Sequence, residues 1–120
     1  IICYDLRFPV WCRNVSNEYD LIIAVANWPR PRREVFRTLL RARAMENLSY
    51  VIGVNRVGED PNRLVYSGDS VIIDPRGKAL IEAEEGVEAV ITTTLDYAPL
   101  QDLRQKFPVW ADADPFLLQI

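Results

Sequence analysis

Residues 1–9 read Ile1-Ile2-Cys3-Tyr4-Asp5-Leu6-Arg7-Phe8-Pro9, and the rest of the chain is organised around this stretch. Two β-branched apolar residues lead into a cysteine, and Pro9 then opens a short helix predicted over residues 9–15. The order strand, Cys3, turn, helix is that of a nucleophile elbow, which exposes one side chain and leaves backbone N–H groups available to an oxyanion. A helix N-terminus near Cys3 would also favour its thiolate. The alternative for Cys3 is a small apolar side chain buried at a strand end.

An apolar run directly precedes the second stretch of interest. Residues 21–26 predict a strand buried on both faces. The two prolines that follow exclude helix and ladder, so Asn27 and Trp28 begin a loop at the C-terminal end of this strand. Because ligands of α/β sheets gather at such ends, we expect both residues to line a pocket near Cys3. For Trp28, a plain core or loop anchor is the alternative.

The longest helix is predicted over residues 32–48. One stripe, expected to face the sheet, has one acidic member: Val35, Leu39, Ala42 and Glu46. Arginines line the opposite side and are most simply a solvated face: Arg33, Arg37 and Arg41. A carboxylate on a buried face needs a partner, and Arg43 can pair with Glu46. We interpret this as an ion pair that ties helix to sheet, with a catalytic role for Glu46 as the alternative.

The second half of the chain is rich in strands and turns. The predicted elements are a strand at 50–55, a loop at 56–64, a hairpin of strands at 68–74 and 78–83, a third strand at 87–95, a helix at 97–106 with Asp96 as its N-cap, and an irregular apolar tail at 107–118. Helices alternate with strands early and hairpins come late. We therefore expect an α/β fold, with a mixed sheet that carries helices on one face.

Composition excludes several classes of function. The 120 residues carry a net charge of −3, which gives no footprint for nucleic acid. No apolar run approaches the roughly 20 residues of a membrane helix. The absence of histidine excludes a Cys–His pair and a histidine zinc site within these residues. The two cysteines are too few for a disulfide framework, although a bridge between them is the alternative. We expect no metal, no cofactor, no nucleic-acid or membrane partner, and a cytoplasmic location.

Several separated motifs resemble the nitrilase superfamily, the carbon–nitrogen hydrolases. Beyond the opening stretch they are Ala26-Asn27-Trp28-Pro29, Arg41-Ala42-Arg43-Ala44-Met45-Glu46-Asn47, Gly53-Val54-Asn55-Arg56-Val57-Gly58 and Tyr66-Ser67-Gly68-Asp69-Ser70. The resemblance implies half of an αββα four-layer sandwich that dimerises into a homodimer. The chain also begins with Ile1 inside a strand-like run. We therefore expect residues 1–120 to be the C-terminal half of a single carbon–nitrogen hydrolase domain.

The resemblance also implies chemistry. Nitrilase-like enzymes use a Glu-Lys-Glu-Cys set, which implies that Cys3 is the nucleophile and forms a thioester with the substrate. The Glu and Lys members lie N-terminal to the cysteine in this superfamily, and only two residues precede Cys3 here. By position, the backbone N–H of Tyr4 is the expected oxyanion donor.

Within the superfamily, the opening stretch, the Asn-Trp-Pro motif and residues 106–114 are most similar to the ω-amidases. These hydrolyse the distal amide of 2-oxo dicarboxylic acid monoamides, such as 2-oxoglutaramate, to acid and ammonia. The carboxylate of such a small-molecule amide calls for a cation at the pocket mouth. Arg30 and Arg32 are the nearest candidates by sequence, and Arg7 is weaker because it can pair with Asp5 or Glu46 instead. The alternatives are an N-carbamoyl amino acid amidohydrolase and a non-catalytic fragment or pseudoenzyme that acts only in binding or dimerisation.

Overall fold

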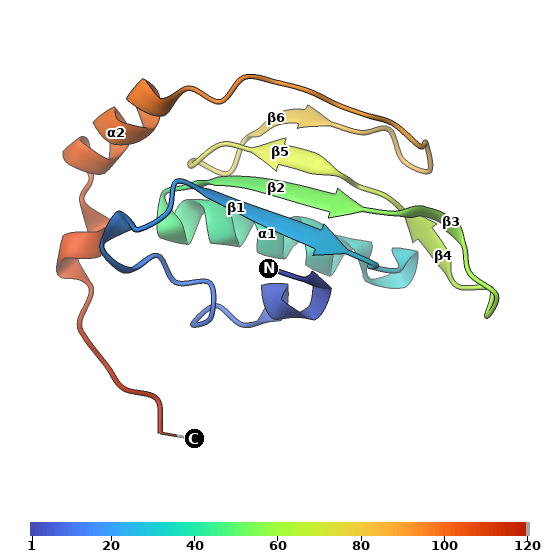
Figure 1. The fold of residues 1–120 in the computed structure, drawn as a ribbon, viewed down its shortest axis with the longest axis horizontal. Coiled ribbons are helices and arrows are strands. Elements are labelled where there is room, and N and C mark those ends of the chain that lie inside the picture. Colours follow the sequence, from blue (N-terminus) through green and yellow to red (C-terminus); the bar gives the residue numbers. More distant parts are fainter. Residues whose placement is uncertain (120) are drawn as a thin grey trace.

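A four-stranded mixed sheet forms the frame of the molecule in a computed structural model that describes residues 1–119 (Figure 1). The sheet order is β1-β2-β5-β6, with strands β1 (Leu21–Ala26), β2 (Tyr50–Asn55), β5 (Val71–Ile73) and β6 (Ala79–Glu82). Strands β1 and β2 are parallel, whereas β5 runs antiparallel to both β2 and β6. The expected α/β fold with a mixed sheet is confirmed, as are the strands at 21–26 and 50–55 and the later hairpin.

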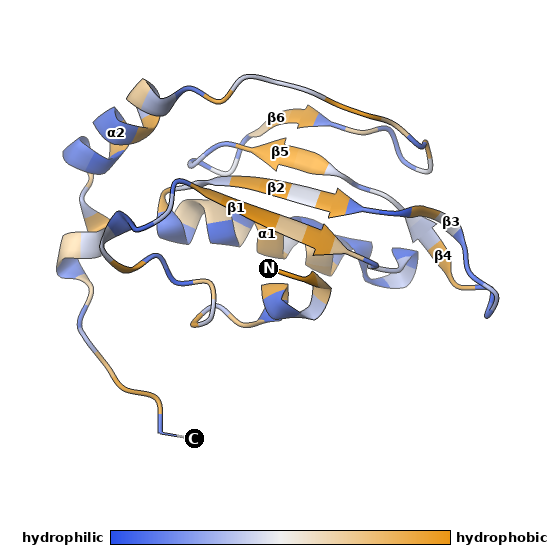
Figure 2. Cartoon of the chain, viewed as in Figure 1, coloured by the Kyte–Doolittle hydropathy of each residue, from blue (hydrophilic) through white to orange (hydrophobic). Residues whose placement is uncertain are grey.

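Helix α1 (Arg33–Asn47) packs on one face of this sheet, in the predicted range. Its buried stripe is adjacent to the predicted one: Phe36, Leu40 and Ala44 are at most 1% exposed. Val35 and Glu46, from the predicted stripe, are exposed instead. The stripe with Phe36 and Leu40 removes more apolar area from water, and it meets the apolar strands coloured orange in Figure 2.

The opposite face of the sheet is open among the described residues. Ile23, Val25 and Val54 are 49%, 53% and 43% exposed, because side chains alternate across a strand. The expectation that the strand at 21–26 is buried on both faces therefore does not hold within this chain. An apolar face of this size is normally covered by another layer.

The segment after Cys3 differs from the prediction. A 3₁₀ helix, η1, spans Cys3–Arg7, turns follow at 9–13, and η2 spans Val15–Asn17, so the helix predicted over 9–15 is wrong. The Asp5 carboxylate accepts a hydrogen bond from the Ile2 N–H at 2.9 Å, which starts the helical turn at Cys3 rather than at Pro9. The helix N-terminus nearest to Cys3 is therefore that of the five-residue 3₁₀ helix η1, which begins at Cys3 itself, and not one at Pro9.

Two further predictions fail in the second half. Strand β3 (Val57–Glu59) lies inside the loop predicted over 56–64, and it pairs with β4 (Val65–Ser67) in a separate hairpin. The Asp60 carboxylate accepts hydrogen bonds from two backbone N–H groups of the hairpin turn, at 2.9 and 3.0 Å, and so closes it. The strand predicted at 87–95 belongs to neither sheet, and Val90 is 97% exposed. The segment has the alternating pattern of a strand, but it pairs with no other strand among the described residues.

Helix α2 (Tyr97–Lys106) confirms the prediction, although the side chain of its N-cap residue, Asp96, makes no capping hydrogen bond. The buried Arg104 fixes α2 by donating to the carbonyl oxygens of Leu48 and Tyr19, at 3.0 and 2.8 Å. Beyond α2, the tail contains the short 3₁₀ helix η4 (Val109–Asp112) and is otherwise irregular, as predicted. In the part of the chain that the structure describes, no helix combines the length and apolarity needed to cross a membrane.

Candidate active site

The first two residues lie along the outer edge of β1 and place Cys3 at its C-terminal end. Ile2 forms a parallel bridge with Val25, and the Val25 N–H donates to the Ile1 carbonyl at 3.2 Å. The Ile1 nitrogen in turn donates to the carbonyl of Ile23 at 2.9 Å. Parallel pairing with β1 therefore delivers Cys3 to the edge where β1 and β2 end.

The backbone of Cys3 is strained. Its φ is 43°, in the left-handed region that residues other than glycine rarely adopt. In η1 the first hydrogen bond of the turn runs from the Asp5 N–H to the Ile2 carbonyl at 3.0 Å. The Cys3 N–H belongs to the parallel bridge of Ile2 with Val25, whereas the Tyr4 N–H precedes the first bond of the turn and is available for a ligand. A strained residue between a strand and a helical turn is the geometry of a nucleophile elbow.

Arg43, on α1, anchors the turn formed by η1. Its side chain is 3% exposed, and its guanidinium donates to the Leu6 carbonyl at 2.6 Å and to the Glu46 carboxylate at 2.9 Å. The ion pair between Arg43 and Glu46 is therefore present, but the buried member is the arginine, and Glu46 is 40% exposed. The pair ties α1 to the turn after Cys3 rather than to the sheet. It does not place Glu46 on the lining of the cavity that contains Cys3.

Trp28 is both a core residue and a wall of the site. Its side chain is 3% exposed and packs on Phe36 with ring centroids 5.5 Å apart. The indole N–H donates to the carbonyl of Arg32 at 2.8 Å, which closes the short 3₁₀ helix η3 (Arg30–Arg32) back onto the ring. Both interpretations of Trp28 from the sequence therefore apply.

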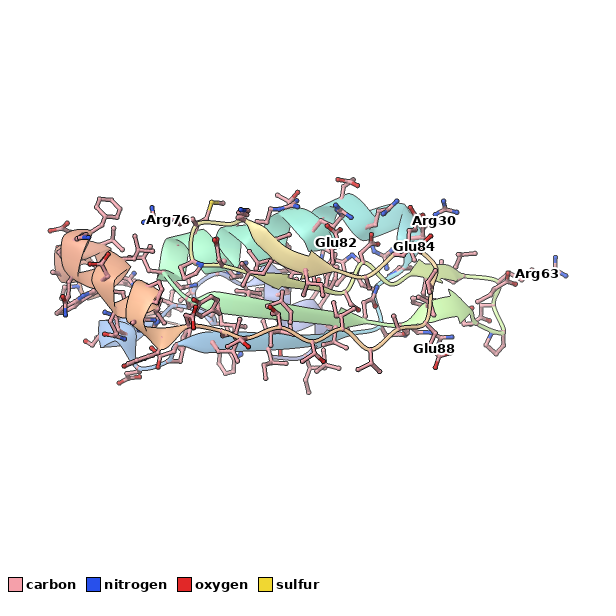
Figure 3. All side chains as sticks on the ribbon, turned by 90° about the horizontal axis from the view of Figure 1, so that it is seen from above. Arg30, Arg63, Arg76, Glu82, Glu84 and Glu88 are labelled. Atoms are coloured by element: carbon pink, nitrogen blue, oxygen red, sulfur yellow. The ribbon has the colours of Figure 1, made fainter. Side chains whose placement is uncertain are left out.

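A cavity of about 280 Å³ lies where these segments meet. Its lining residues are Cys3, Tyr4, Arg7, Asn27, Trp28, Pro29 and Arg32. Five of the residues predicted from the sequence are thus brought together. Arg30 is not among them, because its guanidinium pairs with the Glu85 carboxylate at 3.0 Å. Figure 3 shows Arg30 at the same end of the molecule as Glu84, the residue before Glu85.

Arg7, which the sequence analysis ranked behind Arg30 and Arg32, also lines the cavity. Its guanidinium lies over the Trp28 ring, 4.8 Å from the centroid, and 5.9 Å from the centroid of Tyr4. The two carboxylates that were expected to neutralise it are engaged elsewhere, Asp5 with the Ile2 N–H and Glu46 with Arg43. Among the described residues Arg7 has no salt bridge. A cation stacked on aromatic rings in the cavity is well placed to bind an anion.

The arginines at the start of α1 are not a solvated face. Arg33 and Arg37 both donate to Asp69, at 2.6 and 3.1 Å, and Asp69 is only 2% exposed. Burial alone would raise the pKa of Asp69, but hydrogen bonds from Arg33, Ser67 and Arg37 outweigh it and lower the pKa below its ordinary value. Arg37 also pairs with Glu82 at 2.6 Å, so the network joins α1 to the far edge of the sheet.

The two cysteines occupy different environments, and both are free thiols. Cys3 is partly exposed on the cavity, whereas Cys12 is 3% exposed. Burial raises the pKa of the Cys12 thiol, partly offset by the neighbouring Arg43. No group of three or more metal-binding side chains occurs among the described residues.

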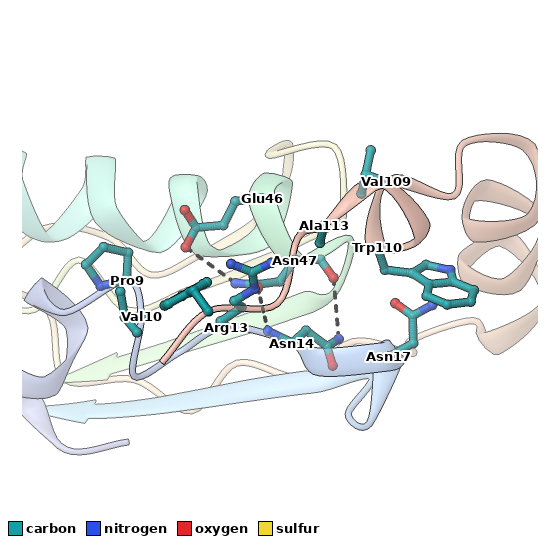
Figure 4. Close-up of a pocket in the computed structure, with 11 residues that line it drawn as sticks. Pro9, Val10, Arg13, Asn14, Asn17, Glu46, Asn47, Val109, Trp110 and Ala113 are labelled. Atoms are coloured by element: carbon teal, nitrogen blue, oxygen red, sulfur yellow. Dashed lines mark hydrogen bonds between the residues drawn. The ribbon is translucent and has the colours of Figure 1, made fainter. Parts of the chain in front are cut away.

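A second cavity of about 280 Å³ lies between the turns after Cys3 and the C-terminal tail (Figure 4). Two of its polar residues are bonded to each other, because the Asn14 backbone N–H donates to the Asn47 amide oxygen at 2.8 Å. The Asn14 side-chain amide also donates to the Tyr19 carbonyl at 2.8 Å. These groups hold the turns in place, and this cavity contains neither cysteine.

Comparisons with known proteins identify relatives of this chain. The family model for carbon-nitrogen hydrolases matches residues 1–105. The chain is 51% identical over 118 residues to the omega-amidase YafV of Escherichia coli K12, covering 98% of this chain and 46% of that protein. It is 36% identical over 115 residues to a 2-oxoglutaramate amidase of Bacillus subtilis, covering 93% and 43% respectively.

A solved structure of this superfamily has the same fold. A CN-hydrolase superfamily protein from Xanthomonas campestris, crystallised with an arsenic adduct in its active site, superposes with a TM-score of 0.93. The two sequences are 48% identical, and the matched region covers 98% of this chain and 47% of the Xanthomonas protein. The chain thus spans about half the length of the curated relatives it matches. With family model, relatives and structure in agreement, the chain belongs to the carbon-nitrogen hydrolase family.

Proposed function

We propose that the protein containing this chain hydrolyses the distal amide of a small carboxylated substrate, with Cys3 as the nucleophile. The observation that carries the proposal is the cavity itself. It joins a cysteine on a strained turn, the available N–H of Tyr4 and a cation, Arg7, that has no carboxylate partner among the described residues. The similarity to an omega-amidase and a 2-oxoglutaramate amidase supports the same assignment.

The proposed reaction has two halves. The Cys3 sulfur, after losing its proton to a base, attacks the amide carbon, and the tetrahedral oxyanion is bound by the Tyr4 N–H. The C–N bond then breaks, the nitrogen leaves as ammonia with the proton taken up by that base, and a Cys3 thioester remains. Water adds to the thioester, the C–S bond breaks, and the products are the carboxylic acid and the restored thiol.

The base and a lysine are to be supplied from outside these 120 residues. Within the described residues, the cavity lining contains no lysine and no carboxylate. The exposed sheet face carrying Ile23, Val25 and Val54 offers a surface for the segment that brings them. We accordingly propose that this chain alone is inactive.

Substrate selection is proposed to depend on the cations of the cavity. With the distal amide at Cys3, the substrate carboxylate extends away from the sulfur, and Arg7 and Arg32 are the two lining cations that can receive it. The stacking of Arg7 on Trp28 holds its guanidinium in one plane, which suits bidentate binding of a carboxylate. Arg30, the other candidate from the sequence, is assigned no such role because it pairs with Glu85.

The test compares 2-oxoglutaramate with an uncharged amide of equal length, using the full-length protein. We expect a strong preference for the charged substrate. In Arg7→Met this preference should fall by about ten- to a hundredfold in kcat/KM, equivalent to losing roughly 1.5–3 kcal/mol of charge-assisted binding. Arg30→Met serves as the matched control and should retain the preference.

Each result discriminates among the alternatives. Equal rates for charged and neutral amides would remove the ω-amidase assignment, and faster turnover of N-carbamoyl amino acids would favour the other amidohydrolase. If the full-length protein shows neither activity, the result would favour the non-catalytic alternative. Loss of the preference in Arg30→Met but not in Arg7→Met would restore the assignment made from the sequence.

We further propose that the protein is a cytoplasmic homodimer that uses its C-terminal tail in the interface. The support is the run of apolar side chains that the tail exposes. Phe107, Leu117 and Leu118 are 60%, 93% and 64% exposed within this chain.

A further inference from the structure

The side chain of Asn55, at the C-terminal end of β2, binds both backbone groups of a residue in the active-site wall. Its amide oxygen accepts a hydrogen bond from the Trp28 N–H at 2.7 Å. Its amide nitrogen donates to the Trp28 carbonyl at 2.9 Å and to the Gly68 carbonyl at 2.8 Å. One carboxamide therefore uses its acceptor and both of its donors on the loops that follow β1 and β4.

We propose that Asn55 is a positioning residue that fixes Trp28 and, through it, Arg7, and so maintains the preference for carboxylated substrates. This inference rests on the proposed function and adds a residue that does not line the cavity containing Cys3. Asn55 acts at the backbone of Trp28, while the ring of Trp28 supports the guanidinium of Arg7 at 4.8 Å.

Asn55 is itself held rigidly. Its backbone N–H donates to the Ser70 hydroxyl at 2.9 Å, and that hydroxyl donates to the Asn55 carbonyl at 3.2 Å. Gly68 has a φ of 78°, and a Cβ there would lie 2.8 Å from a methyl group of Val57. The close approach of the Gly68 carbonyl to Asn55 therefore depends on glycine at that position.

The chemistry of a carboxamide is specific here. An asparagine presents one acceptor and two donors in a plane, which matches one N–H and two carbonyl groups. Leucine has nearly the same shape but satisfies none of the three, and leaves the Trp28 N–H without its partner. Trp28 has no other backbone hydrogen bond to a loop among the described contacts, so its position relative to Arg7 should loosen.

A residue with only a structural role would behave differently from a positioning residue. Loss of stability alone lowers the amount of folded protein, and the turnover of every substrate then falls by the same factor. Loss of Arg7 positioning reduces binding of an anionic group and spares a neutral one. The decisive readout is therefore a ratio between an anionic and a neutral reactant, measured on the folded fraction.

The experiment uses Asn55→Leu and Asn55→Ala in the full-length protein, with Asn47→Leu as the matched control. Asn47 is also a buried carboxamide with a bonded oxygen and nitrogen, at 2.8 and 2.9 Å, but it lies outside the cavity that contains Cys3. Two ratios are measured. One is kcat/KM for 2-oxoglutaramate over that for a neutral amide of equal length, and the other is the rate of Cys3 alkylation by iodoacetate over that by iodoacetamide.

We expect both ratios to fall by about tenfold in the Asn55 variants, towards the values of Arg7→Met. Asn47→Leu should lower the melting temperature and leave both ratios unchanged. The proposal is overturned if the Asn55 variants keep the wild-type ratios, or if Asn47→Leu changes them equally. It is also overturned if Arg7→Met leaves the alkylation ratio unchanged.

The alkylation ratio needs no turnover, so it separates the two proposals. If the wild-type protein fails to discriminate between the amides, the proposed function fails, and Asn55 is still judged by alkylation. Should Asn55→Leu fold poorly, Asn55→Ala, which introduces no apolar bulk between the loops, decides the question by the same ratios.

Discussion

At the scale of single residues, the two thiols should differ sharply in reactivity. Cys3 is partly exposed on the cavity, whereas Cys12 is buried and the pKa of its thiol is raised by that burial. In the folded full-length protein, iodoacetamide should therefore modify Cys3 more than about tenfold faster than Cys12. Peptide mapping by mass spectrometry after short exposures measures both rates. Similar labelling of the two cysteines, or protection of Cys12 but not Cys3 by substrate, would contradict the assignment of Cys3 as nucleophile.

The same scale shows where reasoning from the sequence worked and where it stopped. Cys3, Tyr4, Asn27, Trp28 and Arg32 could be placed together, because strand ends and a turn after a cysteine are local patterns. Arg7 was ranked low because the identity of its partner depends on which carboxylates are already occupied. That is a property of the folded network: the carboxylates expected to neutralise Arg7 are bound elsewhere.

At the scale of elements, the network around Asp69 should make the attachment of α1 depend on pH. The folded-state pKa of Asp69 is lowered, so its stabilisation is fully present above the unfolded pKa of about 4 and is lost as pH falls through the lower folded value. Asp69→Asn should destabilise the protein at pH 7, by about 3–5 kcal/mol for a broken buried pair, and flatten the acid limb of the stability curve. Asparagine also tolerates the φ of 61° at this position, which isolates the effect of charge.

Urea denaturation between pH 3 and 7 measures the effect, with Asp102→Asn as a control. Asp102 pairs with Lys106 on the surface of α2, where the pair contributes little. If the free energy of unfolding falls with decreasing pH equally steeply in wild type and in Asp69→Asn, the network does not cause the pH dependence.

The elements also differ in how far their sequence determined them. Helix α1, helix α2 and the strands β1 and β2 were predicted because each carries enough local pattern over six or more residues. The hairpin of β3 and β4 was missed because its strands have three residues each, and its turn depends on one carboxylate, that of Asp60. The strand predicted at 87–95 failed for the opposite reason, since alternation specifies a face but does not supply a neighbouring strand.

At the scale of the whole molecule, the tail is expected to contribute to self-association. Its apolar side chains stay largely exposed, Leu117 at 93%, although the Arg13 guanidinium lies 4.8 Å from the centroid of the Phe116 ring and donates to the Asp114 carbonyl at 3.4 Å. Removing residues 107–120 from the full-length protein should therefore convert a dimer into monomer or aggregate. Sedimentation velocity distinguishes these states. A well-folded and active monomer after the truncation would contradict the proposed homodimer.

The strained backbone of Cys3 has a consequence for how stability and activity are balanced. A side chain at a φ of 43° costs about 1–2 kcal/mol relative to glycine, and this cost is present in every resting molecule, with or without substrate. Cys3→Gly should thus raise the melting temperature above that of the wild-type protein, while Cys3→Ala should not. Under the proposed mechanism, the more stable variant would then be the inactive one, because relief of the turn also removes the sulfur that the turn presents.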